Sequence, residues 1–122
     1  MSGILDIEVY FPSTYIEQEV LEERDLCHGK YTKGLGQKSM AVVADNEDIY
    51  SFLLTVADRM IKKHNLTADH IGRVEVGTES SIDKSKSVKT LIMDLFGEGP
   101  HDMEGVTNVN ACYGVLLLYL IA

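Results

Sequence analysis

Two residues that follow predicted strands have the types needed for acyl-transfer chemistry. Cys112 stands between a predicted strand and an apolar run, and Glu79 ends the string Val76-Gly77-Thr78-Glu79. At a helix start, unpaired N–H groups favour the thiolate form of a cysteine and can hold an oxyanion. A carboxyl group at a strand end can remove and return a proton as a general acid and base. Together the two residues indicate Cys-Glu acyl chemistry.

Each of these residues also has a purely structural interpretation. Free cysteine is among the most buried residue types, so Cys112 is also consistent with a small core residue. Glu79 has Thr78, Ser80 and Ser81 around it, which is consistent with an ordinary solvated loop. Residue type and position alone leave both interpretations open.

Lysine-bearing segments are a further chemical feature. Lys30 and Lys33 lie in a glycine-rich loop over residues 29–37, and three more lysines follow Glu79: Lys84, Lys86 and Lys89. Ammonium groups and exposed N–H groups suit a phosphorylated ligand, whereas the alternative is a set of ordinary surface lysines. The loop lacks GxxxxGK[ST] and GxGxxG, which excludes a P-loop or dinucleotide-binding fingerprint. The four histidines have no metal-ligand spacing, so no metal site is predicted.

Composition restricts the classes of protein and partner. The 122 residues suffice for one domain with a core, and the net charge of -8 argues against nucleic-acid binding. Two cysteines, Cys27 and Cys112, without a CxxC motif indicate a reducing compartment. The longest apolar run, Val115–Ala122, is far shorter than the ~20 residues of a membrane span. We therefore expect a cytoplasmic protein without a targeting signal or a membrane span.

Hydrophobic periodicity predicts alternating strands and helices. The predicted helix over 17–26 has Val20 and Leu21 as its inward positions, and Thr67 is a predicted cap. This order indicates an α/β fold with a mostly parallel sheet, in which the chemistry gathers at the carboxyl ends of strands. The other predicted elements are strands over 4–11, 40–44, 74–76 and 106–109 and helices over 47–61 and 87–96.

Six short sequence segments, taken in their order along the chain, indicate a protein family far more specifically than any single residue does. Together they closely resemble eukaryotic hydroxymethylglutaryl-CoA synthase, and the resemblance extends through Gly114. It implies a thiolase-like fold, of which residues 1–122 form an incomplete N-terminal half with a mixed sheet and covering helices. The strings are Glu8-Val9-Tyr10-Phe11-Pro12, Gly29-Lys30-Tyr31-Thr32, Gly34-Leu35-Gly36-Gln37, Gly72-Arg73-Val74-Glu75-Val76-Gly77-Thr78-Glu79, Ile82-Asp83-Lys84-Ser85-Lys86-Ser87-Val88-Lys89 and Asn110-Ala111-Cys112-Tyr113-Gly114.

The resemblance implies a specific reaction and specific roles. The family condenses acetyl-CoA with acetoacetyl-CoA and water to give hydroxymethylglutaryl-CoA and free CoA, ahead of mevalonate. Cys112 would accept the acetyl group, and Glu79 would act as general acid and base. Lys30, Cys27 and His28 lie where the family contacts CoA, although Cys27-His28 replaces a pair that is often acidic and small. The CoA thioesters are substrates, no bound cofactor is implied, and a homodimer is expected.

The resemblance stops after Gly114. The family continues with a small-residue helix of the type GGTAALFNS, whereas this chain reads GVLLLYLIA. Loss of one base from the second glycine codon would produce this ending, so we expect residues 115–122 to be a frameshifted, non-family tail. The chain would then lack the family's catalytic histidine and most of its CoA site, and we expect it to be inactive alone.

Two alternatives to a synthase remain from the sequence. One is a non-catalytic fragment or a module that binds a full-length subunit. The other is a different acyltransferase with the thiolase fold, which the string ending at Glu79 and the segment Gly29–Thr32 disfavour.

Overall fold

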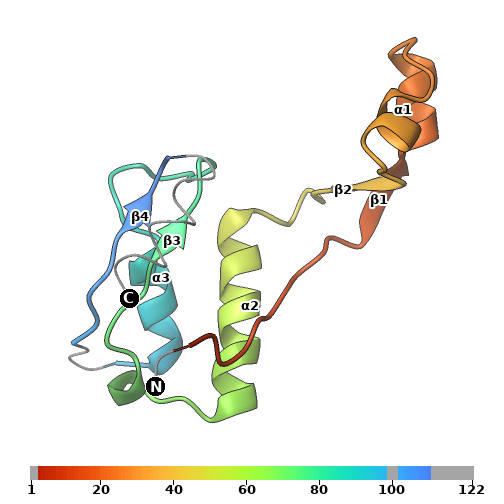
Figure 1. Cartoon of the computed structure of the whole chain (residues 1–122). Helices are drawn as coiled ribbons and strands as arrows, with labels where there is room; N and C mark the ends of the chain where they lie inside the picture. Colours follow the sequence, from red (N-terminus) through yellow and green to blue (C-terminus); the bar gives the residue numbers. More distant parts are fainter. Residues whose placement is uncertain (1–2, 99–101, 111–122) are drawn as a thin grey trace. The chain divides into compact units, whose positions relative to one another are not determined.

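A computed structural model of the protein describes residues 3–98 and 102–110. The chain divides into two units, one formed by Tyr10–Asp48 and the other by Met1–Val9 with Ile49–Ala122. Figure 1 gives the elements of each.

The unit Tyr10–Asp48 contains an antiparallel pair of strands that frames a helix and a basic loop. Its strands are β1 (Thr14–Glu17) and β2 (Ser39–Val42), with Thr14 opposite Val42 and Glu17 opposite Ser39. Between them lie α1 (Gln18–Arg24) and η1, a π-helical turn over Lys30–Gly34. The loop with Lys30 and Lys33 is therefore held at both ends by a paired strand.

The inward face of α1 is polar, which corrects the sequence prediction. Val20 is 57% exposed, while Gln18 and Glu22 are buried at 4% and 5% exposure. The reason is local, because Glu22 turns toward the N–H groups of the following loop instead of toward solvent. Hydrophobicity predicted Val20 and Leu21 as the inward positions and could not detect this hydrogen-bonding demand.

The predicted strand over 4–11 is also wrong, since none of these described residues is in a strand. Its acidic positions bind α2 (Ile49–His64) instead of facing water. Asp6 Oδ2 lies 2.7 Å from Lys63 Nζ and 2.5 Å from His64 Nε2. Hydrogen bonds from these two side chains hold the pKa of Asp6 well below its usual range. Alternation of residue types is consistent with a strand, but a strand also requires a partner for its backbone ladder.

The second unit packs two helices against a short parallel pair of strands. Its strands are β3 (Val76–Gly77) and β4 (Thr107–Asn108), and its second helix is α3 (Lys89–Met93). Short 3-10 turns, η2 (Ala68–His70) and η3 (Asp94–Phe96), follow the two helices, with Thr67 capping η2 as predicted. The core consists of Val76, Val88 and Ile92, against which Tyr50, Leu53, Ala57, Val74 and Leu91 pack.

The parallel pairing brings two backbones into close contact at Gly105. The N–H of Val74 donates to Glu104 O at 2.9 Å, and that of Val76 donates to Val106 O at 3.0 Å. Gly105 lies between these bonds with a φ of +143°, and a Cβ atom there would lie 1.7 Å from Val74 O. Only glycine combines this φ with the absence of a side chain.

Gly105→Ala should therefore destabilise the unit strongly. The clash and the unfavourable φ act together, and we expect the free energy of unfolding to fall by more than ~1 kcal/mol. Urea denaturation followed by circular dichroism measures this loss. Gly72→Ala is the matched control, because nothing lies within 4 Å of a Cβ atom built there. Equal effects of the two substitutions would contradict the role assigned to Gly105.

Candidate functional site

The carboxyl ends of β3 and β4 form the edge at which Glu79 lies. The strands run parallel, with Val76 opposite Thr107 and Gly77 opposite Asn108. The N–H of Thr78 donates to Asn108 O at 2.9 Å, so the ladder continues beyond the strands. Glu79 and Asn110 each lie two residues beyond the end of a paired strand. Cys112 follows two residues later in the sequence and lies outside the described residues.

Glu75 precedes β3 and Glu79 follows it, and the two carboxylates have different surroundings. Glu79 is exposed, in a bend stabilised by a 3.1 Å hydrogen bond from Ser80 N–H to Thr78 Oγ1. Glu75 instead pairs with Arg73, whose Nη2 lies 2.5 Å from Glu75 Oε1. Asn108 Nδ2 donates to its second oxygen at 3.1 Å. Glu75 is therefore a structural carboxylate that ties β3 to β4, a role that sequence reasoning missed.

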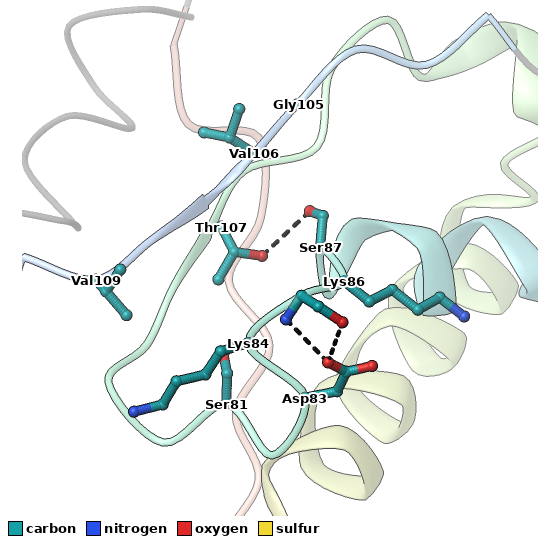
Figure 2. Close-up of a pocket in the computed structure, with 10 residues that line it drawn as sticks. Ser81, Asp83, Lys84, Lys86, Ser87, Gly105, Val106, Thr107 and Val109 are labelled. Carbon is teal, nitrogen blue, oxygen red and sulfur yellow. Dashed lines mark hydrogen bonds between the residues drawn. The ribbon is translucent and has the colours of Figure 1, made fainter.

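A pocket of about 430 Å³ lies beside β4 (Figure 2). The serine- and lysine-rich segment after Glu79 forms one wall, and β4 with its flanking residues forms the other. The lining residues are Ser81, Asp83, Lys84, Ser85, Lys86, Ser87, Gly105, Val106, Thr107 and Val109.

Asp83 organises the polar wall of this pocket. Its Oδ1 accepts hydrogen bonds from the hydroxyl of Ser85 at 2.6 Å and from the Ser85 N–H at 2.9 Å. These bonds lower the pKa of the Asp83 carboxyl. The N–H of Asp83 donates to the hydroxyl of Tyr50 at 2.8 Å, which fastens the segment to α2.

The three lysines that follow Glu79 have different surroundings. Figure 2 shows the side chains of Lys84 and Lys86 extending in different directions from the backbone. Lys89 Nζ donates to the carbonyl of Met103 at 2.9 Å, which gives it a structural role. The sequence prediction that these three lysines, together with Lys30 and Lys33, could hold a phosphorylated ligand stays a prediction.

Thr107 joins β4 to the start of α3. Its Oγ1 accepts a hydrogen bond from Val88 N–H at 2.9 Å and lies 3.2 Å from Ser87 Oγ. Val88 is only 1% exposed, so water cannot readily replace this bond. The side chain thus fixes the position of the pocket wall relative to the strand that leads to Cys112.

In the other unit, Cys27, His28 and Lys30 lie together in the basic loop. Cys27 is a half-buried free thiol, whereas His28 and Lys30 are exposed. Lys30 Nζ lies 5.7 Å from the centre of the Tyr31 ring, a cation–π distance. The ammonium group of Lys30 and the imidazole of His28 are thus both exposed to solvent, and only Gly29 separates the two residues in the sequence.

The carboxylate of Glu22 in α1 binds the backbone of this loop. Its carboxylate accepts hydrogen bonds from the N–H groups of Gly29, Tyr31 and Thr32 at 2.7, 2.6 and 2.7 Å. The hydroxyl of Thr32 adds a fourth bond at 3.0 Å. The bond from Thr32 N–H is the largest of the effects that lower the pKa of Glu22 to about 2. No sequence motif pointed to Glu22, although a glutamate shortly before a glycine-rich loop is the available signal.

Two further features, a metal-binding cluster and a membrane-spanning helix, were sought among the described residues. Across 3–98 and 102–110, no group of three or more His, Cys, Asp or Glu side chains is placed to hold a metal ion. No helix in those ranges has both the length and the apolar character required to cross a membrane.

Comparison with known sequences now identifies the family. A family model described as "Hydroxymethylglutaryl-coenzyme A synthase N terminal" matches residues 1–119. The chain belongs to the hydroxymethylglutaryl-CoA synthase family. This confirms the resemblance found in the sequence, while the prediction that residues 115–122 are a non-family tail stays a prediction.

Individual synthases show how much of the family's length is present. The chain is 55% identical over 114 residues to hydroxymethylglutaryl-CoA synthase A of Dictyostelium discoideum, covering 92% of this chain and 24% of that protein. It is 54% identical over 114 residues to the cytoplasmic hydroxymethylglutaryl-CoA synthase of Homo sapiens. That match covers 92% of this chain and 22% of the human protein. The chain thus spans about a quarter of the length of the curated synthases that it matches.

Solved structures confirm the thiolase-like α/β fold. MvaS in complex with 3-hydroxy-3-methylglutaryl coenzyme A is 35% identical, with a TM-score of 0.79 over 90% of this chain and 26% of that chain. A 3-oxoacyl-(acyl-carrier-protein) synthase III is 18% identical, with a TM-score of 0.76 over 97% of this chain and 36% of that chain. At this level of identity the likeness supports the fold alone. The predicted fold class, an incomplete N-terminal part of a thiolase-like architecture, is therefore confirmed.

Thr107→Val should weaken the synthase domain at the pocket wall. Valine has nearly the same shape but cannot accept the Val88 N–H, and leaving a buried donor unpaired costs about 1–3 kcal/mol of unfolding free energy. Chemical denaturation measures the loss. Thr107→Ser keeps the hydroxyl and should retain most of the stability. If serine and valine destabilise equally, the hydrogen bond is not the cause.

Proposed function

We propose that this chain carries the acetyl-accepting and proton-transferring residues of a hydroxymethylglutaryl-CoA synthase. The complete enzyme would condense acetyl-CoA with acetoacetyl-CoA and water, releasing hydroxymethylglutaryl-CoA and CoA. Family membership supports the reaction. The observation that supports the assignment of residues is the parallel register of β3 and β4. Glu79 follows the end of β3 by two residues, and Cys112 follows the end of β4 by four residues in the sequence.

The first chemical step is acetyl transfer to Cys112. The thiolate sulfur attacks the thioester carbonyl of acetyl-CoA, a carbon–sulfur bond forms, and CoA leaves as the thiol after gaining a proton. A soft thiolate suits this exchange because it forms a thioester that remains reactive. The product of this step is an acetyl group held on Cys112.

The second step needs a base, which we assign to Glu79. Its carboxylate removes a proton from the acetyl methyl group, and the resulting carbanion attacks the ketone carbon of acetoacetyl-CoA. The ketone oxygen takes up a proton to become the product hydroxyl. Water then hydrolyses the thioester to Cys112, releasing the carboxylate of hydroxymethylglutaryl-CoA and restoring the thiol. The exposure of Glu79 leaves its side chain accessible to a substrate at the edge of the sheet.

The basic loop is the proposed contact for CoA. Lys30 supplies an exposed ammonium group suited to phosphate, with Cys27 and His28 beside it in the same loop. CoA enters as part of the substrates, and no other cofactor is assigned. A homodimer and the cytoplasmic location named for the Homo sapiens relative are proposed for the complete protein as well.

A non-catalytic binding module is the second candidate. Large apolar side chains are exposed in the described residues, including Leu5 at 98%, Leu26 at 86% and Phe11 at 76%. Such surfaces favour association with another subunit or aggregation. Size-exclusion chromatography together with thermal melting distinguishes a folded module from an aggregate.

The assignments of Cys112 and Glu79 can be tested in a fusion protein. Residues 1–114 would replace the matched region of the Dictyostelium discoideum synthase, which supplies the remaining length. Cys112→Ala should abolish both acetyl-enzyme formation and turnover. Glu79→Gln should still form acetyl-Cys112, because proton removal follows acetylation, while turnover falls by about 10²–10⁴. Mass spectrometry of the acetylated protein and steady-state release of CoA measure the two effects.

The exposed Glu98 supplies the matched control for Glu79. Glu98→Gln in the same fusion should leave acetylation and turnover unchanged. Normal turnover with Glu79→Gln would remove Glu79 from the mechanism. Acetylation that persists in Cys112→Ala would remove Cys112.

The 122-residue chain by itself should give no turnover of acetyl-CoA and acetoacetyl-CoA. It spans about a quarter of its relatives' length, and the resemblance assigns a catalytic histidine and most of the CoA site to the remainder. A coupled assay for free CoA on the purified chain measures this. Turnover that Cys112→Ala abolishes would show the prediction to be wrong.

A further inference from the structure

Glu22 occupies a place where backbone N–H groups usually meet an external anion. Successive N–H groups that converge in a turn form a concave nest suited to phosphate or carboxylate. Here the N–H groups of Gly29, Tyr31 and Thr32 converge within 2.6–2.7 Å of the two Glu22 oxygens. The nest is therefore filled by a side chain of the same unit, which is 5% exposed.

The other N–H groups between Gly29 and Gly34 also have acceptors. Lys30 N–H donates to Cys27 O at 3.0 Å, and the N–H groups of Lys33 and Gly34 donate to Gly29 O at 3.2 and 2.9 Å. Together with the bonds to Glu22, every backbone donor from Gly29 to Gly34 has an acceptor within the unit Tyr10–Asp48. The sequence suggested exposed N–H groups for phosphate in this loop, and over Gly29–Gly34 the structure contradicts that suggestion.

The cationic side chains of the loop remain available to a ligand. Lys30 and Lys33 are exposed. The Tyr31 ring under Lys30 is positioned at both ends, since its N–H binds Glu22 and its hydroxyl donates to Asp25 Oδ2 at 2.8 Å. The hydrogen bond to Asp25, followed by the effect of Cys27, raises the pKa of Tyr31 to about 12. Tyr31 therefore stays a neutral surface for the ammonium group.

We propose that Glu22 is a positioning residue that acts as a built-in anion for the loop Gly29–Gly34. Its carboxylate orders the loop before any ligand arrives, so that an anionic ligand is bound by the ammonium groups of Lys30 and Lys33 and not by the backbone. Identification of that ligand as CoA rests on the proposed function. The ordering by Glu22 does not.

Amide hydrogen exchange on the 122-residue chain tests the ordering directly. Near neutral pH, exchange at Gly29, Tyr31 and Thr32 should be slow in the wild type and about tenfold faster or more in Glu22→Gln, because a neutral amide binds donors more weakly than a carboxylate. Glu23→Gln, the neighbouring exposed position, is the matched control and should leave exchange unchanged. Amides of Leu53 and Ala57 in α2 report whether the second unit stays folded.

The pH profile separates an anion from a merely structural side chain. The pKa of Glu22 is lowered from 4.5 to about 2, so its contribution is complete above pH 4.5 and is lost as the pH falls toward 2. The other titratable groups of α1 and the loop are Glu19, Glu23, Arg24, Asp25, Cys27, His28, Lys30, Tyr31 and Lys33. After correction for the intrinsic pH dependence of exchange, the protection of the three amides should follow this pH profile in the wild type. In Glu22→Gln the protection should no longer change with pH over this range.

Chemical rescue provides a second readout on the same chain. Glu22→Ala leaves the nest without its anion, and added sodium formate should restore slow exchange at Gly29, Tyr31 and Thr32. Formate should not change exchange in the wild type, where the nest is filled. Slow exchange in Glu22→Gln without any anion, or a failure of formate to protect Glu22→Ala while Leu53 and Ala57 keep wild-type exchange, would overturn the proposal.

CoA itself distinguishes this inference from the proposed function. Phosphorus NMR should show broadening of the CoA phosphate signals by the wild-type chain, less broadening by Glu22→Gln, and almost none by the Lys30→Gln, Lys33→Gln double variant. Stronger broadening by Glu22→Gln would overturn the positioning role, because the carboxylate would then be a competitor of the ligand. If the lysine variants behave like the wild type, the CoA contact fails while the exchange data still decide the role of Glu22.

Discussion

The parallel pairing of β3 with β4 is the constraint on which the candidate active site depends. Four backbone hydrogen bonds, from the N–H groups of Val74, Val76, Thr78 and Glu104, set the register. Each strand is only two residues long, so this ladder would be weak without additional contacts. Gly105 permits the close approach of the two backbones, and Thr107 ties β4 to α3. Together they hold at one edge the two segments that lead to the proposed base and the proposed nucleophile.

Three glutamates show that surroundings decide what a carboxylate does. Glu22 receives four hydrogen bonds from a loop and becomes part of that loop's framework. Glu75 is neutralised by Arg73 and held by Asn108, so it serves the pairing of the strands. Glu79 is exposed beyond the end of β3, and it is the residue proposed as the base. All three have the same chemical group, and their surroundings differ.

The sequence was most informative where local periodicity and packing agree. The predicted helix over 47–61 corresponds to α2, and the strands predicted near Val76 and Thr107 correspond to β3 and β4. These elements share one apolar core, so their hydrophobic pattern has a single interpretation. The segment 4–11 and the inward face of α1 were mispredicted because their residues satisfy specific partners: Asp6 binds the end of α2, and Glu22 binds a loop. Periodicity cannot detect a partner that lies many residues away.

The candidate site shows the same division between what a motif can predict and what it cannot. The family strings predict that Glu79 and Cys112 follow neighbouring strands, and the parallel register is observed as far as Gly77 and Asn108. The strings did not distinguish Lys89, which donates to a carbonyl, from Lys84 and Lys86, which line the pocket. A lysine's role depends on the acceptors within its reach, and those are determined by tertiary structure. The approach of two chain segments can therefore be determined by two short strands, whereas the role of each charged side chain depends on contacts from several segments and has to be established one residue at a time.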